Sequence, residues 1–328
     1  MEPRLVRIIN GLQTGFPLTS APFRLAADRL NLTEEELIQG IAALLADGDV
    51  TRFGPFFNAE RWGGGVTLAA MRVPVDDYEQ VAALVNAQPE VAHNYAREHA
   101  LNMWFVVATE RKEQIHAVLA RLSALTGLEV FNLPKLEEYR LGFQVVLRDD
   151  GGVDSCFLED PPIVEHDREP DTFDRAVIAA TQAGISLIPE PYAEIARGLG
   201  VDEERLLERM QWMIRCGWMR RIGLATNHYR LGLKGNGMSV WSVPDERVRA
   251  LGRQIGTLDF VTHCYRRPRH LPTWPYNLFV MVHGADRSAV AAKVQVLAEV
   301  IGADNQGHLV LHSTRILKKT GLRLSSFS

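Results

Sequence analysis

Histidine, tyrosine and arginine recur at two-residue spacing near residue 95. His93, Tyr95, Arg97 and His99 occupy alternate positions of one apolar-flanked stretch. Along a β-strand, alternate side chains point to the same face of the sheet. In such a strand these four residues would form a polar, cationic wall rather than part of a hydrophobic core. A wall of this kind could bind anions and transfer protons.

The same residue types recur half a chain later. His263, Tyr265 and Arg267 alternate in residues 261–270, and Arg266 would point to the opposite face. A single histidine on a strand is more often a hydrogen-bonded structural residue than a ligand. Its recurrence with the same tyrosine and arginine neighbours favours a function. Arginine pairs bidentately with carboxylates, and a neutral imidazole can transfer protons or contact iron.

Further basic and aromatic residues lie close to the second stretch or near the C-terminal end. These candidate ligand-binding residues are Arg269, His270, Trp274, Tyr276, Arg315 and Lys318. The cations suit a molecule with several carboxylates, and the large rings suit a flat macrocycle, although Trp274 and Tyr276 would serve a core equally well. Together these residues predict a carboxylate-rich metal tetrapyrrole as ligand. Phosphate esters would satisfy the arginines almost as well.

Both stretches belong to an internal duplication. Residues 22–54 align with residues 191–223, and after a slip of one position residues 74–97 align with residues 244–267. Each half begins with three short helical patterns and one short strand, followed by the element order βαββαβ. This order predicts an α+β fold of two tandem repeats, each a winged helix-turn-helix followed by a ferredoxin-like domain.

Composition shifts and repeat boundaries divide the chain into five segments. We expect winged helix-turn-helix domains at 1–63 and 171–233, ferredoxin-like βαββαβ domains at 64–148 and 234–328, and an acidic linker at 149–170. The linker is rich in Asp, Glu, Gly and Pro, a composition typical of solvated connections.

Overall composition is that of a globular protein. The 328 residues carry a formal net charge of -4, and the pI is about 6.2, so any anion-binding site must be built from a local cluster. The three cysteines are far apart and predict neither a disulfide framework nor a thiolate zinc site. No signal peptide or long apolar run is evident, so we expect a cytoplasmic protein without membrane attachment.

A helix-turn-helix followed by βαββαβ resembles the Lrp/AsnC family of transcription regulators. A DNA-reading third helix should present basic and amide side chains to phosphates and bases. In the first half this helix begins with three glutamates at 34–36 and carries no Lys or Arg, and in the second half it begins with acidic residues 202–204. These carboxylates also favour a helix N-terminus. We therefore expect no DNA binding.

More specific motifs resemble the siroheme decarboxylase family. They lie at 93–105, 235–241, 263–284 and 313–319. In that family two related subunits pair, and two acetate side chains of siroheme lose carbon dioxide to give 12,18-didecarboxysiroheme in haem d1 biosynthesis. The resemblance implies that this chain is a fused two-subunit form and a carboxy-lyase.

For the site, the resemblance implies His93 and His263 as the catalytic pair, one as acid and the other as acid or iron contact. It implies no resident metal or cofactor, since the iron belongs to siroheme. The substrate would contact the remaining candidates: Tyr95, Arg97, His99, Tyr265, Arg266, Arg267, Arg269, His270, Trp274, Tyr276, Arg315 and Lys318.

Two other functions fit the same motifs. A tetrapyrrole-sensing, DNA-binding regulator would keep the fold, and a non-catalytic carrier would bind siroheme and release it intact. We expect the two halves to pair with each other, and the chain to act alone, as a homodimer or with sister subunits. The first half lacks the insertion at 272–276, so the two pockets need not be equivalent.

Overall fold

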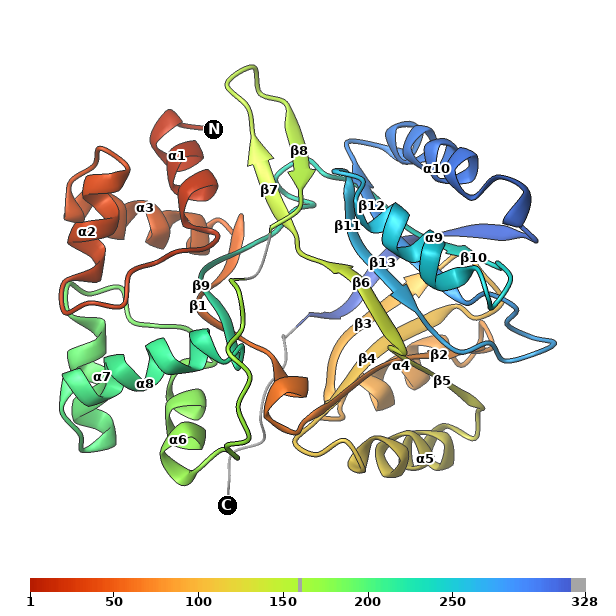
Figure 1. Ribbon diagram of the computed structural model, residues 1–328, viewed down its shortest axis with the longest axis horizontal. Helices are drawn as coiled ribbons and strands as arrows, with labels where there is room; N and C mark the ends of the chain where they lie inside the picture. The colour runs from red at the N-terminus through yellow and green to blue at the C-terminus, as the bar shows by residue number, and fades with distance from the viewer. Residues whose placement is uncertain (159–160, 320–328) are drawn as a thin grey trace. The chain divides into compact units, whose positions relative to one another are not determined.

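The computed structural model describes residues 1–158 and 161–319, which form two compact units (Figure 1). The helical unit comprises 1–62, 144–154 and the described part of 159–233. The sheet unit comprises 63–143, 155–158 and the described part of 234–328. Each unit contains residues from both halves of the duplication, so neither half folds as a separate body.

Three helices from each half build the helical unit, as the sequence predicts. They are α1 Pro3–Leu12, α2 Pro22–Arg29 and α3 Glu34–Ala46, then α6 Thr172–Thr181, α7 Pro191–Leu199 and α8 Glu203–Arg215. Thr33 and Glu36 form the predicted capping box at the start of α3. Gly48 and Gly217, which follow α3 and α8, both have a φ of 76°, a conformation that favours glycine and ends each helix.

The short strand after each helix trio joins the two halves. β1 Val50–Phe57 and β9 Met219–Thr226 pair antiparallel with each other rather than folding back as separate wings. A hairpin spans the expected domain boundary, since β7 Gln144–Leu147 lies at the end of the expected ferredoxin-like segment and β8 Val153–Cys156 lies in the expected linker. Its first strand is held by α1, where Asn10 Nδ2 donates to the Leu147 carbonyl at 2.8 Å.

The chain just before α6 runs along α8. The Val164 amide donates to the Arg215 carbonyl at 2.8 Å. The His166 ring lies 4.9 Å from the ring of Trp212 and 5.4 Å from that of Trp218. This part of the acidic segment is therefore packed against the helical unit although most of its residues are exposed.

The sheet unit is built on one continuous sheet. Its strands are β2 Gly65–Met71, β3 Val91–Arg97, β4 Met103–Thr109, β5 Val130–Pro134, β6 Glu137–Leu141, β10 Gly235–Trp241, β11 Val261–Arg266, β12 Leu278–Gly284 and β13 His308–Lys319. Among the described residues the order is β5-β2-β4-β3-β13-β10-β12-β11-β6. The helices are α4 Tyr78–Asn86, α5 Gln114–Thr126, α9 Val248–Gly256 and α10 Arg287–Ile301. Each half has the predicted βαββαβ order.

The last strand of each half crosses to the other half. Residues 308–312 of β13 pair with β10 of their own half, and residues 313–319 pair with β3 of the first half. In the first half the same path is divided between β5, which pairs with β2, and β6, which pairs with β11. The two halves thus exchange their closing strands and complete one another's sheets.

Equivalent asparagines fix the same turn in both halves. Asn102 accepts from the Val73 amide and donates to its carbonyl, both at 2.9 Å. Asn277 makes the same two bonds to Val243, at 3.1 and 3.0 Å. Because both pairs come from aligned positions, the repeat seen in the sequence is a repeat in three dimensions.

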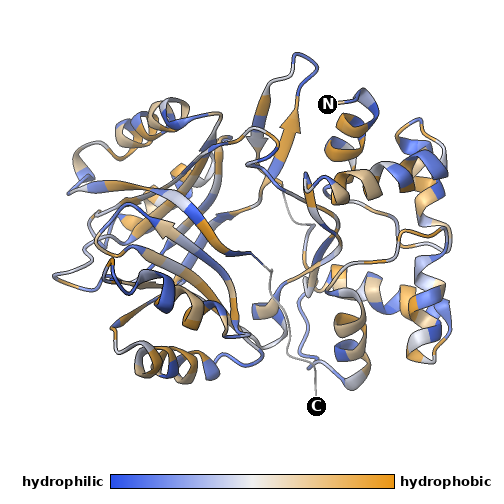
Figure 2. Cartoon of the chain, turned by 180° about the vertical axis from the view of Figure 1, so that it is seen from behind, coloured by the Kyte–Doolittle hydropathy of each residue, from blue (hydrophilic) through white to orange (hydrophobic). Residues whose placement is uncertain are grey.

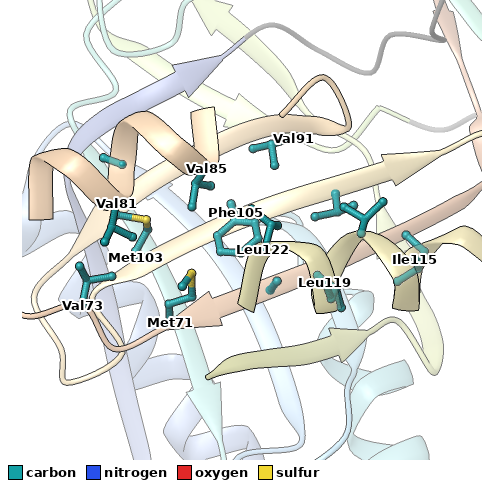
Figure 3. Packing of buried hydrophobic residues seen from close by; sticks show 14 residues of the cluster. Met71, Val73, Val81, Val85, Val91, Met103, Phe105, Ile115, Leu119 and Leu122 are labelled. Atoms are coloured by element: carbon teal, nitrogen blue, oxygen red, sulfur yellow. The ribbon is translucent and has the colours of Figure 1, made fainter. Parts of the chain in front are cut away.

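Helices cover one face of the sheet. Figure 3 shows Val81 and Val85 of α4 and Leu119 and Leu122 of α5 packed around Phe105 of β4. A matching cluster under α9 and α10 forms the core of the second half. Figure 2 shows polar and apolar residues interleaved along these helices, as expected when only one side packs on a sheet. None of the helices in residues 1–158 and 161–319 is long and apolar enough to span a membrane.

Gly223 in β9 tests the close packing that joins the halves of the helical unit. A Cβ at this position would lie 2.5 Å from the carbonyl oxygens of Leu12 and Gln13. We expect Gly223→Ala to lower the free energy of unfolding by about 1–3 kcal/mol, as overpacking does. Gly198→Ala in α7 is the matched control, since a Cβ there would meet no atom within 4 Å. This variant should raise the free energy of unfolding by about 0.5–1 kcal/mol, because alanine is more favourable than glycine inside a helix. Urea unfolding measures both, and equal stability of the two variants would contradict the assignment.

Candidate functional site

Three of the residues predicted to do chemistry lie together on β3, and we call them the first triad. The ring centroids of His93 and Tyr95 are 6.3 Å apart, and the Arg97 guanidinium lies 5.8 Å from the Tyr95 ring. Nη1 of Arg97 donates to the carbonyl of Leu311, at 2.6 Å. Arg97 is 8% exposed. The arginine therefore ties the first triad to the closing strand of the other half.

The second triad, on and directly after β11, repeats this geometry. The ring centroids of His263 and Tyr265 are 6.0 Å apart, and the Arg267 guanidinium lies 5.1 Å from the Tyr265 ring. Nη1 of Arg267 donates to the carbonyl of Leu133 in β5. Each triad arginine thus donates to a main-chain carbonyl of the other half.

Both triads lie on the sheet face away from the helices. The residues between their members point to the helices instead, since Asn94 donates to Asn86 of α4 at 3.0 Å and Cys264 belongs to the core under α9. This is the alternation expected from the sequence.

The two triads lie at separate places on the sheet. Strands β13, β10 and β12 lie between β3 and β11 in the sheet order. An apolar cluster from both halves occupies the helix-free face: Ala70, Leu101, Trp104, Phe131, Leu133, Met238, Val240, Trp274, Phe279 and Leu311. Its leucines 133 and 311 supply the carbonyls that the triad arginines contact.

His93 is kept uncharged by its surroundings. Burial lowers its pKa to about 4, and the nearby Lys319 ammonium lowers it further in the same direction. Nδ1 of His93 is buried and has no hydrogen-bond partner among the described residues. A buried imidazole nitrogen without a partner is available to a ligand.

His263 has a different local environment. Its Nδ1 lies 2.9 Å from the hydroxyl oxygen of Thr262, and the direction of that bond depends on the tautomer. His263 is opposite Leu141 in the paired strand, whereas His93 is opposite Lys319. The triads therefore share their geometry and differ in their neighbours.

Two predicted cations of β13 lie on the helix-covered face. Arg315 pairs with Glu79 at 2.5 Å, and Lys318 donates to the Asn86 carbonyl at 2.7 Å. Their register explains this, because they are opposite Ala96 and Asn94 rather than opposite triad residues. The structure thus places them on the face opposite His93, and their part in ligand binding stays a prediction.

Arg266 and Arg269 are also held by protein groups. Arg266 pairs with Glu137 at 3.1 Å on the helix-covered face. Nη1 of Arg269 donates to Ser242 Oγ at 3.0 Å, and its Nη2 lies 3.4 Å from Asp245. These contacts fix the loop that follows β11.

The predicted aromatic and remaining histidine residues pack between the halves. Trp274 is fully buried, with its ring 5.7 Å from that of His99 and 4.9 Å from that of Tyr276. Nε2 of His270 lies 2.7 Å from the Asn132 carbonyl oxygen, and Nδ1 of His99 accepts from the Leu101 amide. In this structure they hold the second-half insertion against the first half.

Sequence reasoning pointed to the cations at the end of β13, Lys319 among them, but missed Ile316 and Ser313, which β13 also places beside the first triad. Lys319, Ile316 and Ser313 are opposite His93, Tyr95 and Arg97 respectively. Directly opposed residues of antiparallel strands share a face. Only the pairing register of β13 with β3 could have identified them, because more than 200 positions of sequence separate the strands. The described residues contain no cluster of three or more His, Cys, Asp or Glu suited to a metal ion.

Two family models match the chain. One, described as an AsnC-like ligand binding domain, matches residues 63–140 and 230–318. The other, described as a siroheme decarboxylase NirDL-like HTH domain, matches residues 6–50 and 174–220. Both match twice, once in each half.

Curated relatives match over the whole chain or over half of it. The siroheme decarboxylase NirDL subunit of Paracoccus pantotrophus is 32% identical over 98% of this chain and 97% of its own length. The siroheme decarboxylase of Hydrogenobacter thermophilus is 30% identical over 98% of this chain and 94% of its own length. The NirH subunit of P. pantotrophus is 53% identical over 47% of this chain and 96% of its own length.

Solved structures agree with these matches. The crystal structure of siroheme decarboxylase NirDL superposes with a TM-score of 0.71 at 27% identity, covering 99% of this chain and 94% of that one. A second NirDL structure, in complex with an iron-uroporphyrin III analogue, gives a TM-score of 0.70 at 27% identity, covering 98% and 93%. With the duplicated helix-turn-helix and ferredoxin-like architecture and full-length relatives of at least 30% identity, the chain belongs to the siroheme decarboxylase family.

Proposed function

We propose that this protein removes carbon dioxide from the two acetate side chains of siroheme, leaving methyl groups and yielding 12,18-didecarboxysiroheme. The repeated His-Tyr-Arg triad carries the proposal, since it combines a proton-transferring group with cations in a family whose relatives are named for this reaction. The iron enters with the substrate, and we propose no resident cofactor.

The chemistry requires little beyond placement and a proton. The bond from the acetate methylene carbon to its carboxylate carbon breaks, carbon dioxide leaves, and the electron pair is taken up by the pyrrole ring. A proton must then reach the methylene carbon to form the methyl group. Each acetate consumes one proton and releases one carbon dioxide, so no oxidant or reductant is needed. A positioned histidine is suited to deliver that proton.

The electrostatics of His93 suit a proton that is taken up with the substrate. In the free protein its pKa of about 4 keeps the imidazole neutral near pH 7. Substrate carboxylates beside it would favour the imidazolium and offset the charge of Lys319. The neutral imidazole can accept a proton or contact iron. The imidazolium, formed when an anionic substrate lies beside it, can act as the acid.

Further subunits are part of the proposal. NirH and NirG of P. pantotrophus, each 53% identical to part of this chain, are named as siroheme decarboxylase subunits. The halves of this chain already pair through exchanged strands. We propose that the chain acts as such a pair, as a homodimer or together with related subunits of the family.

A DNA-binding regulator is a weaker reading of the helical unit. Arg209 of α8 forms ion pairs with Asp171 at 3.0 Å and Asp174 at 2.7 Å. In α3 the three glutamates stand at the N-terminus, and no Lys or Arg follows them in the helix. A major-groove reader needs free donors and cations on this helix.

Decarboxylation is tested directly by incubating the purified chain with siroheme under anaerobic conditions. We expect mass spectrometry to detect the loss of one and then two carbon dioxide units. The double variant His93→Ala/His263→Ala should be slower by roughly a hundredfold or more, because a general acid typically contributes 10²–10⁴-fold. His116→Ala, at an exposed position of α5, is the control and should retain full activity. Siroheme recovered unchanged from the wild type would reject the proposed function.

The neutral state of His93 predicts a pH dependence of stability. Its pKa is about 4 in the folded protein and about 6.5 in the unfolded chain, so between these values the unfolded chain binds the extra proton. Stability therefore falls as the pH falls from 6.5 towards 4. Between pH 7 and pH 5 the wild type should lose about 1–2 kcal/mol more than His93→Asn does. Urea unfolding at both pH values measures this difference, and His116→Asn should behave as the wild type.

A further inference from the structure

The two triads face different partner strands, although those strands are equivalent in the duplication. The carbonyls of Leu311 and Leu133 accept hydrogen bonds from the two triad arginines, so these two leucines are equivalent positions. Counting from them, residues 313–319 of β13 align with residues 135–141, which comprise β6 and the two residues before it. On that alignment Lys319 corresponds to Leu141, and Ile316 corresponds to Glu138.

Strand pairing places these residues on the triad faces. Lys319 is opposite His93, and Leu141 is opposite His263. Ile316 is opposite Tyr95, and Glu138 is opposite Tyr265. The first triad thus has a lysine and an isoleucine where the second has a leucine and a glutamate.

The first triad also has polar groups that bind no other described group of the protein. Nδ1 of His93 and Oγ of Ser313 are buried without hydrogen-bond partners in the described part of the chain. The Lys319 side chain is exposed and its ammonium makes no hydrogen bond or ion pair with any described residue, although partial desolvation by the surrounding protein lowers its pKa. Buried polar atoms normally have partners, so unpaired ones beside a free cation indicate a place for a ligand.

The second triad lacks these features. Thr262 lies within hydrogen-bond distance of Nδ1 of His263, and Glu138 forms an ion pair with Lys135 at 2.6 Å. Lys135 also lies 5.9 Å from the Tyr265 ring. A carboxylate arriving at this triad would meet the charge of Glu138 and would compete with it for Lys135.

From these differences we propose that the first triad is the site that receives the polycarboxylate macrocycle, with Lys319 as the residue that binds one of its carboxylates. Ile316, which is 41% exposed, offers an apolar surface to the ring beside that contact. Arg97 then serves as a positioning residue, because its Nη1 is committed to the Leu311 carbonyl. This inference rests on the proposed function, since it assumes an anionic tetrapyrrole as substrate.

Binding of iron-uroporphyrin III, followed by its absorption spectrum on the full-length chain, tests the inference. We expect Lys319→Leu to weaken binding at least about tenfold, the effect of losing one hydrogen bond between charged groups. Lys319→Arg should keep binding within about threefold. Leu141→Lys, the reciprocal change at the second triad, should not weaken binding. A Lys319→Leu protein that binds as tightly as the wild type would overturn the assignment.

Salt and single histidine variants separate the sites further. Weakening of binding by added salt should be less steep for Lys319→Leu than for the wild type, because one ionic contact is removed. His93→Ala should slow siroheme turnover at least about tenfold more than His263→Ala does, because only the first histidine would face the bound macrocycle. The opposite pattern would assign the substrate to the second triad.

An independent readout comes from nuclear magnetic resonance of the His93 ring. Since Lys319 lowers the pKa of His93, Lys319→Leu should raise that pKa, and the value in the wild type should rise when the macrocycle binds. An unchanged His93 pKa in both experiments would contradict the proposed contact. Failure of the wild type to bind any tetrapyrrole would instead reject the proposed function itself.

Discussion

The exchange of closing strands is the constraint on which the site depends. β13 leaves its own half at residue 312 and pairs with β3 from residue 313 onward, and β6 does the same for β11. Without this crossing, the histidine strands would be sheet edges with unpaired backbone groups. The crossing also brings the acceptor carbonyls of Leu311 and Leu133 to the two triad arginines.

The role of the arginines shows how burial redirects a side chain that the sequence suggests for ligand binding. A guanidinium has five donors, and burying it requires partners for them. In this fold the buried Arg97 and the half-buried Arg267 each donate to a main-chain carbonyl of the other half, and these bonds stabilise the junction between the halves. The Lys319 side chain, in contrast, is exposed and is not committed to a main-chain carbonyl among the described residues.

Local patterns predicted much of this structure. The capping box of Thr33 and Glu36, the repeated βαββαβ order and the alternation of His93, Tyr95 and Arg97 depend on neighbours in sequence, and each is confirmed. The placement of Arg315 and Lys318 could not be predicted in this way, because it depends on which residue of β3 each one faces. Two register shifts in β13 decide that pairing, and a strand pattern does not encode them.

The acidic segment before α6 is a similar case. Its composition predicts a solvated connection, and most of its residues are exposed. The His166 ring nevertheless packs against the rings of Trp212 and Trp218, and the Val164 amide donates to the last carbonyl of α8. A few contacts from a polar segment are enough to order it, and they depend on tertiary structure.

The reciprocal arginine contacts have a consequence for how the protein must assemble. Each triad is completed by main chain that belongs to the opposite repeat, so a repeat expressed by itself would lack the acceptor that orients its own guanidinium. Each triad is therefore complete only after both repeats have been synthesised and have docked. Covalent fusion supplies the missing repeat at a high effective concentration, and it also lets the two triads acquire different neighbours, which identical subunits of a symmetric dimer could not do.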